Sequence, residues 1–316
     1  MRDLIQLGDI HAAWERIHRQ VHRTPTLPSR QLGRRFGVKL FFKAELFQKT
    51  GSFKVRGVLN KLHGLSPQKR GRGFVSMSAG NHAAALAWAS SLIGAPSAIV
   101  MPEGAARSKL DATRGYGGEV VLTRGDLMEV CNAVRDERGM TMVHPFDDPA
   151  IMAGHGTMGL EIVEDLPDVD LLIVPVGGGG LISGTAAAVK ALAPNVRIVG
   201  VEPVGAEAMT RGLAAGRPVQ VERPPTIADG LAAPFAGEHT LRHVQELVDD
   251  VVLVSDTSIA EALRLIMTRT KLAAEPSGAA ALAALLEGKV DLTRARRVVC
   301  VISGGNVDLD VLKGLL

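Results

Sequence analysis

Short apolar segments alternate with longer amphipathic segments along most of the chain. Runs rich in Val and Ile, bounded by Gly, Pro or Asp, predict strands. They occupy residues 39–44, 97–101, 119–122, 171–176, 197–203, 249–254 and 297–303. Apolar residues at helical spacing, with Gly or Ser at the ends, predict helices at 80–94, 125–139, 183–193, 258–272 and 277–289. This alternation is typical of strand–helix–strand units and parallel sheets.

The number of predicted strands favours two sheets over one, because a chain of 316 residues can form two cores. We expect one sheet around residues 74–145 and another after residue 168. The expected fold is α/β, with two open twisted sheets, flanking helices and a cleft between two domains. We place the larger domain at residues 1–52 and 146–316, and the smaller one at residues 53–145.

Composition and charge exclude several classes of protein. The 36 Lys and Arg residues are scattered among 33 Asp and Glu, and only eight Phe, two Trp and one Tyr could stack on bases. Nucleic acid is therefore not an expected partner. No run reaches the roughly 18 apolar residues of a membrane span, and the N-terminus lacks the apolar stretch of a signal peptide. Two distant cysteines, Cys131 and Cys300, fit a reducing compartment, so we expect the cytoplasm.

Three turns rich in Gly or Ser follow predicted strands or lie close to them. They are Ser76–His82, Pro175–Gly184 and Val301–Asn306. In an open α/β sheet, such turns leave the carboxyl ends of the strands, where ligands bind. Their convergence would form a binding site.

The second turn contains four consecutive glycines, Gly177, Gly178, Gly179 and Gly180, between an apolar strand and an apolar helix. Bare backbone N–H groups at a helix N-terminus form a cradle for phosphate. The glycines could also serve only a tight, closely packed turn. The dinucleotide pattern fails, since Ile182 or Ser183 stands where its third glycine is needed, and no Gly-Lys-Ser/Thr follows. A phosphate carried by another kind of cofactor remains.

Lys54 lies in "QKTGSFKVRG", after a turn of small residues and at the start of a predicted helix. A lone lysine in such a place is usually a solvated charge. A phosphate cradle without a nucleotide signature, together with this lysine, matches the needs of pyridoxal phosphate. The lysine amine would form a Schiff base with the aldehyde of that cofactor.

Several motifs together carry a resemblance to a known family. In order, they are "TGSFKVRG", "SAGNH", "GGGG", "ADGLA", "EPSGAAALAALL" and "SGGN", and they extend from residue 50 to residue 306. The chain resembles the threonine/serine dehydratase branch of the fold-type II pyridoxal phosphate enzymes, which also contains serine racemase. The resemblance covers nearly the full chain and implies a homodimer.

The resemblance implies roles for the residues that match the family motifs. Lys54 would hold the cofactor, and Phe53 would lie against its ring. Asn81 would bond the cofactor 3-hydroxyl, and the four glycines with the amide of Leu181 would hold its phosphate. Ser303 would lie beside the pyridine nitrogen, where a neutral hydroxyl leaves the ring a weaker electron sink and favours elimination over transamination.

The same resemblance implies a substrate site. Its predicted residues are Ser78, Ala79, Asn81 and His82 of the "SAGNH" turn, which would grip the carboxylate of an amino acid, and His155. Close relatives usually carry glutamine at the position of His155, so the side-chain preference is open. Glu275 is expected near the cofactor.

The implied reaction is loss of water from L-threonine or L-serine, giving 2-oxobutanoate or pyruvate and ammonia. Lys54 would remove the α-proton, and the cofactor phosphate is our candidate acid for the leaving hydroxyl. The alternatives are serine racemase, a hydroxyaspartate dehydratase and a non-catalytic binding protein. Isoleucine inhibition is expected to be absent, because only ten residues follow Asn306.

A metal site near Glu202 is in doubt, and no metal ligand is assigned. In metal-binding relatives, Glu202 would be joined by the carbonyl of Ala206 and by an Asp at the position of Ala208. Here that second carboxylate is absent, although Glu207 adjoins the position.

Overall fold

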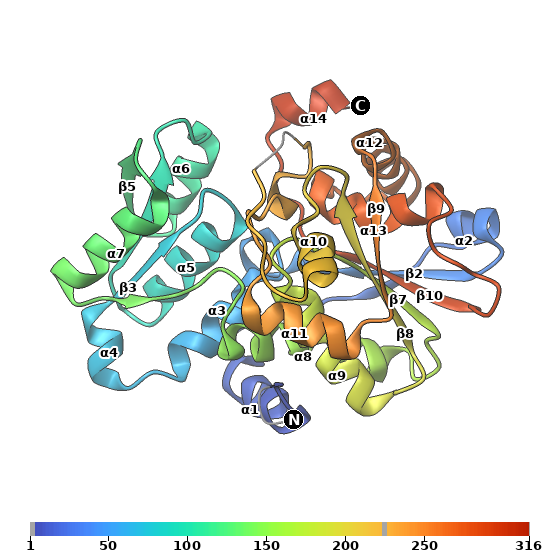
Figure 1. The fold of residues 1–316 in the computed structure, drawn as a ribbon, viewed down its shortest axis with the longest axis horizontal. Coiled ribbons are helices and arrows are strands. Elements are labelled where there is room, and N and C mark those ends of the chain that lie inside the picture. The colour runs from blue at the N-terminus through green and yellow to red at the C-terminus, as the bar shows by residue number, and fades with distance from the viewer. Residues whose placement is uncertain (1–3, 223–225, 316) are drawn as a thin grey trace.

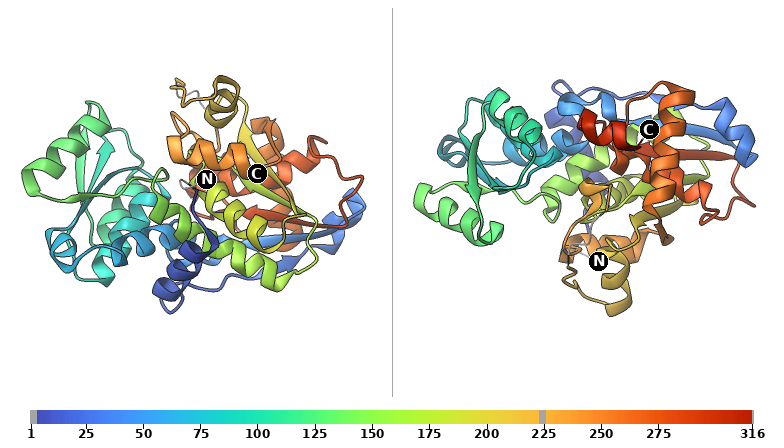
Figure 2. Two further views of the ribbon diagram at one scale, coloured as in Figure 1. Left: turned by 60° about the horizontal axis from the view of Figure 1, so that its bottom comes forward. Right: turned by 90° about the horizontal axis from the view of Figure 1, so that it is seen from above.

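The computed structural model describes residues 4–222 and 226–315, which form two sheets with helices on both faces. Figures 1 and 2 show the smaller sheet and its helices grouped at one side of the molecule, beside the larger sheet. The expected α/β fold with two mostly parallel sheets is confirmed.

The larger sheet has six strands, and only its edge strand β1 is antiparallel. In spatial order they are β1 (Thr26–Pro28), β2 (Lys39–Ala44), β10 (Arg297–Ile302), β7 (Leu171–Pro175), β8 (Arg197–Pro203) and β9 (Asp250–Val254). One face packs on α2 (Arg30–Phe36), α12 (Asp256–Leu265) and α13 (Pro276–Leu286). The other packs on α8 (Pro149–Asp165), α9 (Gly180–Leu192) and α11 (Glu238–Leu247). Burial on both faces explains the continuous apolar runs of its central strands.

The smaller sheet has four parallel strands, in the order β5 (Glu119–Thr123), β4 (Ser97–Pro102), β3 (Phe74–Met77) and β6 (Thr141–Met142). One face packs on α3 (Lys54–His63) and α5 (Asn81–Leu92), and the other on α7 (Leu127–Arg138). The remaining helices are α1 (Leu7–Ile17), α4 (Pro67–Arg72), α6 (Arg107–Gly115), α10 (Ala208–Ala215) and α14 (Leu309–Leu315). Short 3-10 turns occupy Glu45–Phe47, Lys49–Gly51 and Asp229–Leu231.

All seven predicted strands are present. Three further strands, β1, β3 and β6, were not predicted, because they have only two to four residues and show no clear alternation. The helix predicted at 258–272 is shorter, because α12 ends at Leu265 and a π-helical turn follows at Ile266–Thr270. Helix α9 begins three residues early, at Gly180, since Gly179 takes the left-handed conformation and caps it.

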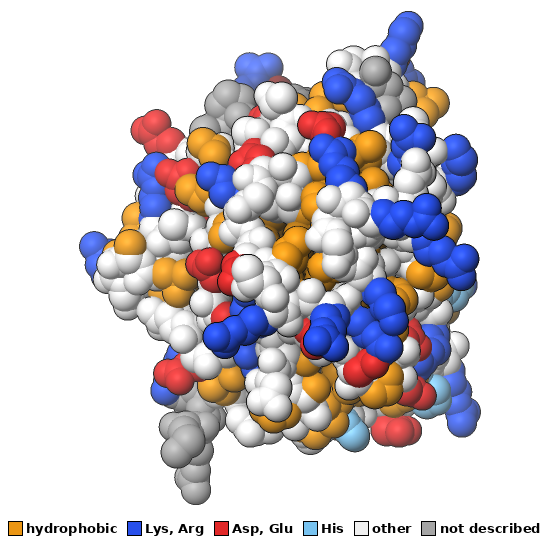
Figure 3. Space-filling model, turned by 90° about the vertical axis from the view of Figure 1, so that its right-hand side faces the viewer, with side chains coloured by type: hydrophobic (Ala, Val, Ile, Leu, Met, Phe, Trp, Pro, Cys, Tyr) orange, Lys and Arg blue, Asp and Glu red, His pale blue; other side chains and the backbone are white. Residues whose placement is uncertain are grey.

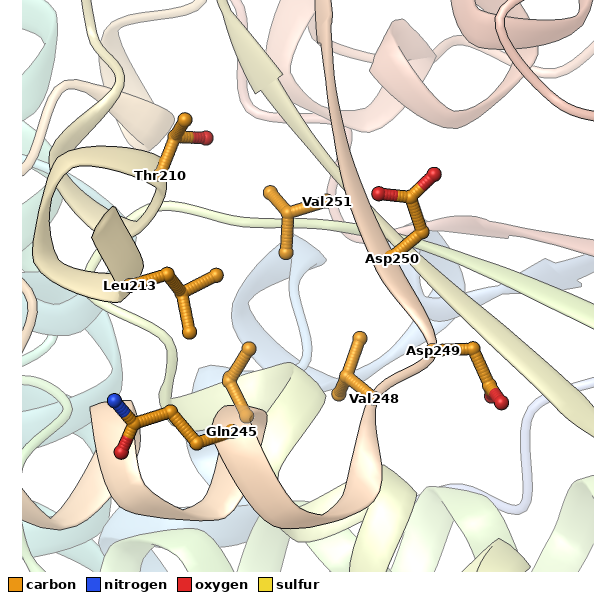
Figure 4. Close-up of a pocket in the computed structure, with 8 residues that line it drawn as sticks. Thr210, Leu213, Gln245, Val248, Asp249, Asp250 and Val251 are labelled. Atoms are coloured by element: carbon orange, nitrogen blue, oxygen red, sulfur yellow. The ribbon is translucent and has the colours of Figure 1, made fainter. Parts of the chain in front are cut away.

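Two hollows lie away from the carboxyl ends of the central strands. Figure 4 shows a cavity at the amino-terminal end of β9, of about 340 Å³, which is lined by residues of α10, of α11 and of the segment 248–251. A groove of about 750 Å³ runs between α2 and β2. Figure 3 views the molecule from the side on which α2 lies in Figure 1, and basic, acidic and apolar side chains are mixed there. Within the described residues, no helix is long and apolar enough to cross a membrane.

Candidate active site

Lys54 is the first residue of α3, and Phe53 forms the helix N-cap. The Lys54 Nζ atom donates a hydrogen bond to the carbonyl oxygen of Pro145 at 2.8 Å and lies 5.1 Å from the centre of the Phe53 ring. The amine is therefore held between the start of α3 and the segment that follows β6.

The loop before Lys54 is joined to the "SGGN" turn at the end of β10. Ser52 pairs with Gly304 as an isolated β-bridge, and the Phe53 N–H donates to the carbonyl of Ser303 at 3.1 Å. Ser303 is buried directly after β10. These bonds bring the lysine and Ser303 to the same carboxyl edge of the larger sheet.

Asn81 connects the first and third turns. Its Nδ2 atom donates to Glu275 Oε1 at 2.8 Å, and its Oδ1 atom accepts from Asn306 Nδ2 at 2.8 Å. Burial, together with the charge of Asp229, raises the pKa of Glu275 to about 8. Glu275 therefore lies beside Asn81, within the site.

The glycine turn runs from β7 into α9, and neighbouring residues press on it from behind. A Cβ atom at Gly178 would collide with the ring of Phe146, and one at Gly179, which has φ of 92°, would lie 2.5 Å from Met209 Cε. Thr240 Oγ1 donates to the carbonyl of Gly178 at 2.7 Å. Pro145 contacts Lys54 and the adjacent Phe146 contacts the glycines, so the lysine and the glycine turn are neighbours.

The backbone N–H groups of this turn are available to a ligand. Among the described residues, no protein acceptor bonds the N–H groups of Gly177, Gly178 and Gly179. The first turn of α9, which includes Gly180 and Leu181, adds further N–H groups without helical acceptors. Such a cluster favours an anion.

The "SAGNH" turn begins at Ser78, after β3. Ser78 Oγ accepts from the N–H of Gly80 at 3.2 Å, and Ala79 presents only a methyl group. The buried His82 ring has Nε2 at 3.1 Å from Ser76 Oγ and 3.2 Å from the carbonyl of Val143. Its side chain therefore engages the smaller sheet, while its backbone N–H lies at the start of α5.

His155 of α8 is fully buried behind Phe53. The two rings meet edge to face with centroids 4.7 Å apart, and neither ring nitrogen of His155 has a hydrogen bond among the described residues. Burial and the charge of Lys54 hold its pKa well below the ordinary value, so the ring is neutral.

The electrostatics of the site favour a reactive amine. Burial lowers the pKa of Lys54 to about 8, although the charge of Glu275 acts in the opposite direction. Burial and the charge of Lys54 also lower the pKa of His82 to about 3. A substantial neutral fraction of Lys54 therefore exists near neutral pH, as a nucleophile or base requires.

This pKa predicts how the cofactor-free protein responds to pH. The neutral amine is the form that attacks an aldehyde, so the rate of pyridoxal phosphate capture should rise about tenfold per pH unit below the pKa and level off above about pH 8. Stopped-flow absorbance measures this rate. A midpoint near the ordinary lysine value of 10.5 would contradict the effect of burial.

The residues present fit pyridoxal phosphate. Free N–H groups and a helix N-terminus suit the phosphate, a buried amine suits the aldehyde, and Phe53 offers an apolar surface for the ring. Ser303 and Asn81, from different turns, supply a hydroxyl and an amide for the polar atoms of the ring. Two packed sheets with this set of groups fit the class of enzymes that use a phosphorylated carbonyl cofactor.

Comparison with known proteins leads to the same class. The chain belongs to the family of pyridoxal-phosphate dependent enzymes, whose model matches residues 17–304. It is 44% identical to an L-threonine ammonia-lyase of Geobacter sulfurreducens over 307 residues, which cover 96% of this chain and 76% of that protein. It is 42% identical to a serine racemase of Oryza sativa subsp. indica, with coverage of 96% and 93%. The solved structure of maize serine racemase matches with a TM-score of 0.94 and 41% identity, covering 98% of this chain and 96% of that one.

Glu202, at the end of β8, has protein partners for both carboxylate oxygens. It is fully buried and accepts from the Met209 N–H at 2.7 Å and from Thr210 N–H and Oγ1 at 2.9 and 2.7 Å. The neighbouring Glu207 accepts from the Gly205 N–H and pairs with Arg211. No group of three potential metal ligands occurs in the described part of the chain. The carboxylate of Glu202 thus caps the N-terminus of α10.

We predict that activity does not depend on a divalent cation at Glu202, because Met209 and Thr210 already satisfy that carboxylate. Adding EDTA or millimolar Mg²⁺ should change the steady-state rate less than about twofold, since Glu202 belongs to no group of three potential metal ligands among the described residues. A tenfold activation by Mg²⁺, lost on chelation, would contradict this prediction, because Glu202 would then have to leave the N-terminus of α10 to bind the metal.

His144 and Phe146 were not predicted from the sequence. They follow the two-residue strand β6 and flank Pro145, whose carbonyl bonds Lys54. His144 and Phe146 pack edge to face at 4.6 Å, and Phe146 and Phe235 do so at 5.5 Å. Both residues lie in the segment "HPFDDP", which follows the carboxyl end of a strand, but that strand was too short to be predicted from the sequence.

Proposed function

We propose that the protein is an L-threonine ammonia-lyase that also accepts L-serine. It would remove water from the substrate and release 2-oxobutanoate or pyruvate and ammonia. The observation that carries the proposal is the buried amine of Lys54, which has a pKa near 8 and bonds the carbonyl of Pro145. Pro145 lies between His144 and Phe146, which form an aromatic wall with Phe235. The similarity to an L-threonine ammonia-lyase supports the proposal.

Lys54 supplies the proton transfer. Its neutral amine accepts the proton from the substrate α-carbon, and the carbonyl of Pro145 keeps the amine oriented. When bound, pyridoxal phosphate supplies the electron sink for the negative charge left on that carbon. The N–H groups at the start of α5 would hold the substrate carboxylate.

The aromatic wall favours L-threonine over hydroxyaspartate, whose side chain carries a second carboxylate. His144 Nδ1 accepts from the Asp147 N–H at 2.9 Å, and burial lowers the pKa of His144, so this ring is uncharged at neutral pH. Phe146 and Phe235 are apolar. A methyl group suits this surface, whereas the extra carboxylate of hydroxyaspartate would be buried without a cation.

Steady-state assays of 2-oxo acid and ammonia test the proposal. L-Threonine should give the highest kcat/KM, L-serine a lower value, and L-threo-3-hydroxyaspartate the lowest. A protein that prefers hydroxyaspartate, or one that binds these amino acids without turnover, would refute it.

Ala79 predicts little racemisation. Racemisation needs an acid or base on each face of the α-carbon, and the methyl group of Ala79 cannot supply a proton opposite Lys54. The wild type should release little D-serine, whereas Ala79→Ser should gain measurable racemisation because it adds a hydroxyl with little extra volume. Chiral chromatography measures both products, and abundant D-serine from the wild type would favour the racemase alternative.

We also propose which residues hold the cofactor and the substrate. The cofactor would be held by Phe53, Lys54, Asn81, Gly177–Gly180, Leu181 and Ser303, and the substrate by Ser78, Ala79, Asn81, His82 and, through Phe53, His155. We further propose domains at residues 1–52 with 146–316 and at 53–145, since the strands of the two sheets divide at these boundaries. A homodimer in the cytoplasm fits the resemblance and the two buried free thiols, Cys131 and Cys300.

A further inference from the structure

Glu45 and Arg56 lie on either side of Lys54 in the sequence and meet in the core. Arg56 Nε donates to Glu45 Oε2 at 2.8 Å and Arg56 Nη2 donates to Glu45 Oε1 at 2.8 Å, and both side chains are fully buried. This two-bond pair, here called the clamp, closes the base of the loop that carries the lysine. Arg56 is also only two residues beyond Lys54 in α3.

Glu161 of α8 and Lys43 of β2 extend the clamp by further ion pairs. Glu161 accepts from Arg56 Nη1 at 2.7 Å and from Nη2 at 2.9 Å, and it pairs with the buried Lys43 at 2.7 Å. The two cations balance the two carboxylates. Burial would raise the pKa of Glu45, but the charge and hydrogen bonds of Arg56 lower it, so the carboxylate stays ionised.

The tip of the same loop is held by weaker, uncharged contacts. Thr50 has φ of 57°, which is uncommon for a residue with a β-branched side chain, and Gly51 has φ of 74°. Asn306 Nδ2 donates to the carbonyl of Thr50 at 2.6 Å, and the Gly305 N–H donates to the carbonyl of Gly51 at 3.0 Å. The strained tip of the loop therefore depends on the clamp, which holds the two ends of the loop in position.

A buried ion pair is seldom the best way to stabilise a core, since well-packed apolar side chains often do as well. The planar fork of arginine, however, fixes direction as well as distance. Here that fork fixes the first turn of α3 against the loop from which Lys54 emerges.

We propose that the Glu45–Arg56 clamp positions Lys54, keeping its amine where it can capture and retain the cofactor. The proposal rests on Lys54 as the cofactor lysine. Displacements of about 1 Å in a reacting group can cost about a hundredfold in rate. Loosening the clamp should therefore impair the lysine before it unfolds the protein.

Arg56→Lys and Glu45→Gln test this idea, since Arg56→Lys keeps the charge without the fork and Glu45→Gln keeps the shape without the charge. Lys61→Gln is the control, because it removes another ion pair of α3, with Asp148, at a residue seven positions beyond Lys54. For each protein, thermal unfolding is recorded, and cofactor capture is timed by borohydride trapping and peptide mapping of Lys54. The absorbance of the bound cofactor against pH and the separate kcat and KM values complete the comparison.

Both clamp variants should stay folded yet capture cofactor on Lys54 about 10- to 100-fold more slowly, with a shifted absorbance midpoint and a larger loss in kcat than change in KM. Lys61→Gln should match the wild type in all of these. Wild-type capture by a folded Glu45→Gln protein would overturn the proposal. Outright unfolding of Glu45→Gln would overturn it too, because the pair would then support the whole fold. If the wild type itself carries cofactor on another lysine, the assignment of Lys54 fails first.

Discussion

Replacing Lys54 with alanine is expected to lower the rate of 2-oxobutanoate formation from L-threonine by at least about a thousandfold. The substitution removes the amine that we propose as the holder of the cofactor and as the base that accepts the α-proton. Among the described residues, no other lysine bonds the carbonyl of Pro145, which accepts from Lys54 Nζ at 2.8 Å. A coupled 2-oxo acid assay measures the loss.

Lys69→Ala is the matched control, because Lys69 is exposed on α4 and should leave the rate unchanged. Borohydride reduction of the wild type, followed by peptide mapping, should place the pyridoxyl group on Lys54 and none on Lys69. A pyridoxyl group on a different lysine, or an alanine variant with a wild-type rate, would falsify the assignment.

Gly179→Ala should weaken pyridoxal phosphate binding at least about tenfold, equivalent to roughly 1.4 kcal/mol. The new Cβ atom would lie 2.5 Å from Met209 Cε and 2.8 Å from Thr240 Cβ, in a backbone conformation with φ of 92°. The turn must move to relieve these contacts, and its N–H groups would lose their common direction. Absorbance titration of the cofactor-free protein gives the dissociation constant.

Gly216→Ala separates the effect of the steric contacts from the effect of the positive φ angle. Gly216 also has positive φ, at 66°, but a Cβ atom there would meet nothing within 4 Å. It carries the backbone cost alone, about 1–2 kcal/mol, and should lower thermal stability without changing cofactor affinity. Equal cofactor affinity in Gly179→Ala and the wild type would mean that the glycines serve only the packing of the turn.

Periodicity predicted the central strands well, and the reason is their burial. The strands β7 and β8 are covered by helices on both faces, so their sequences are short continuous apolar runs between polar or small residues. The strand β6 has two residues and left no such run. Because it was missed, His144 and Phe146 were not recognised as neighbours of Lys54.

The sequence also indicated the groups that carry the chemistry. A lysine at the start of a helix and four glycines after a strand are local features, because a nucleophile needs a particular functional group and a phosphate cradle needs bare amides. The order and spread of the motifs then led to the family, and the match over residues 17–304 agrees with it.

By itself, then, the sequence determined which groups are present, how most of the chain is divided into strands and helices, and to which family the protein belongs. Only the tertiary structure decided what those groups can do. The pKa of Lys54 depends on burial and on Glu275, and Arg56 bonds both Glu45 and Glu161, which lie far apart in the chain. Burial and ion pairing arise from residues far apart in the chain, and no local pattern encodes them.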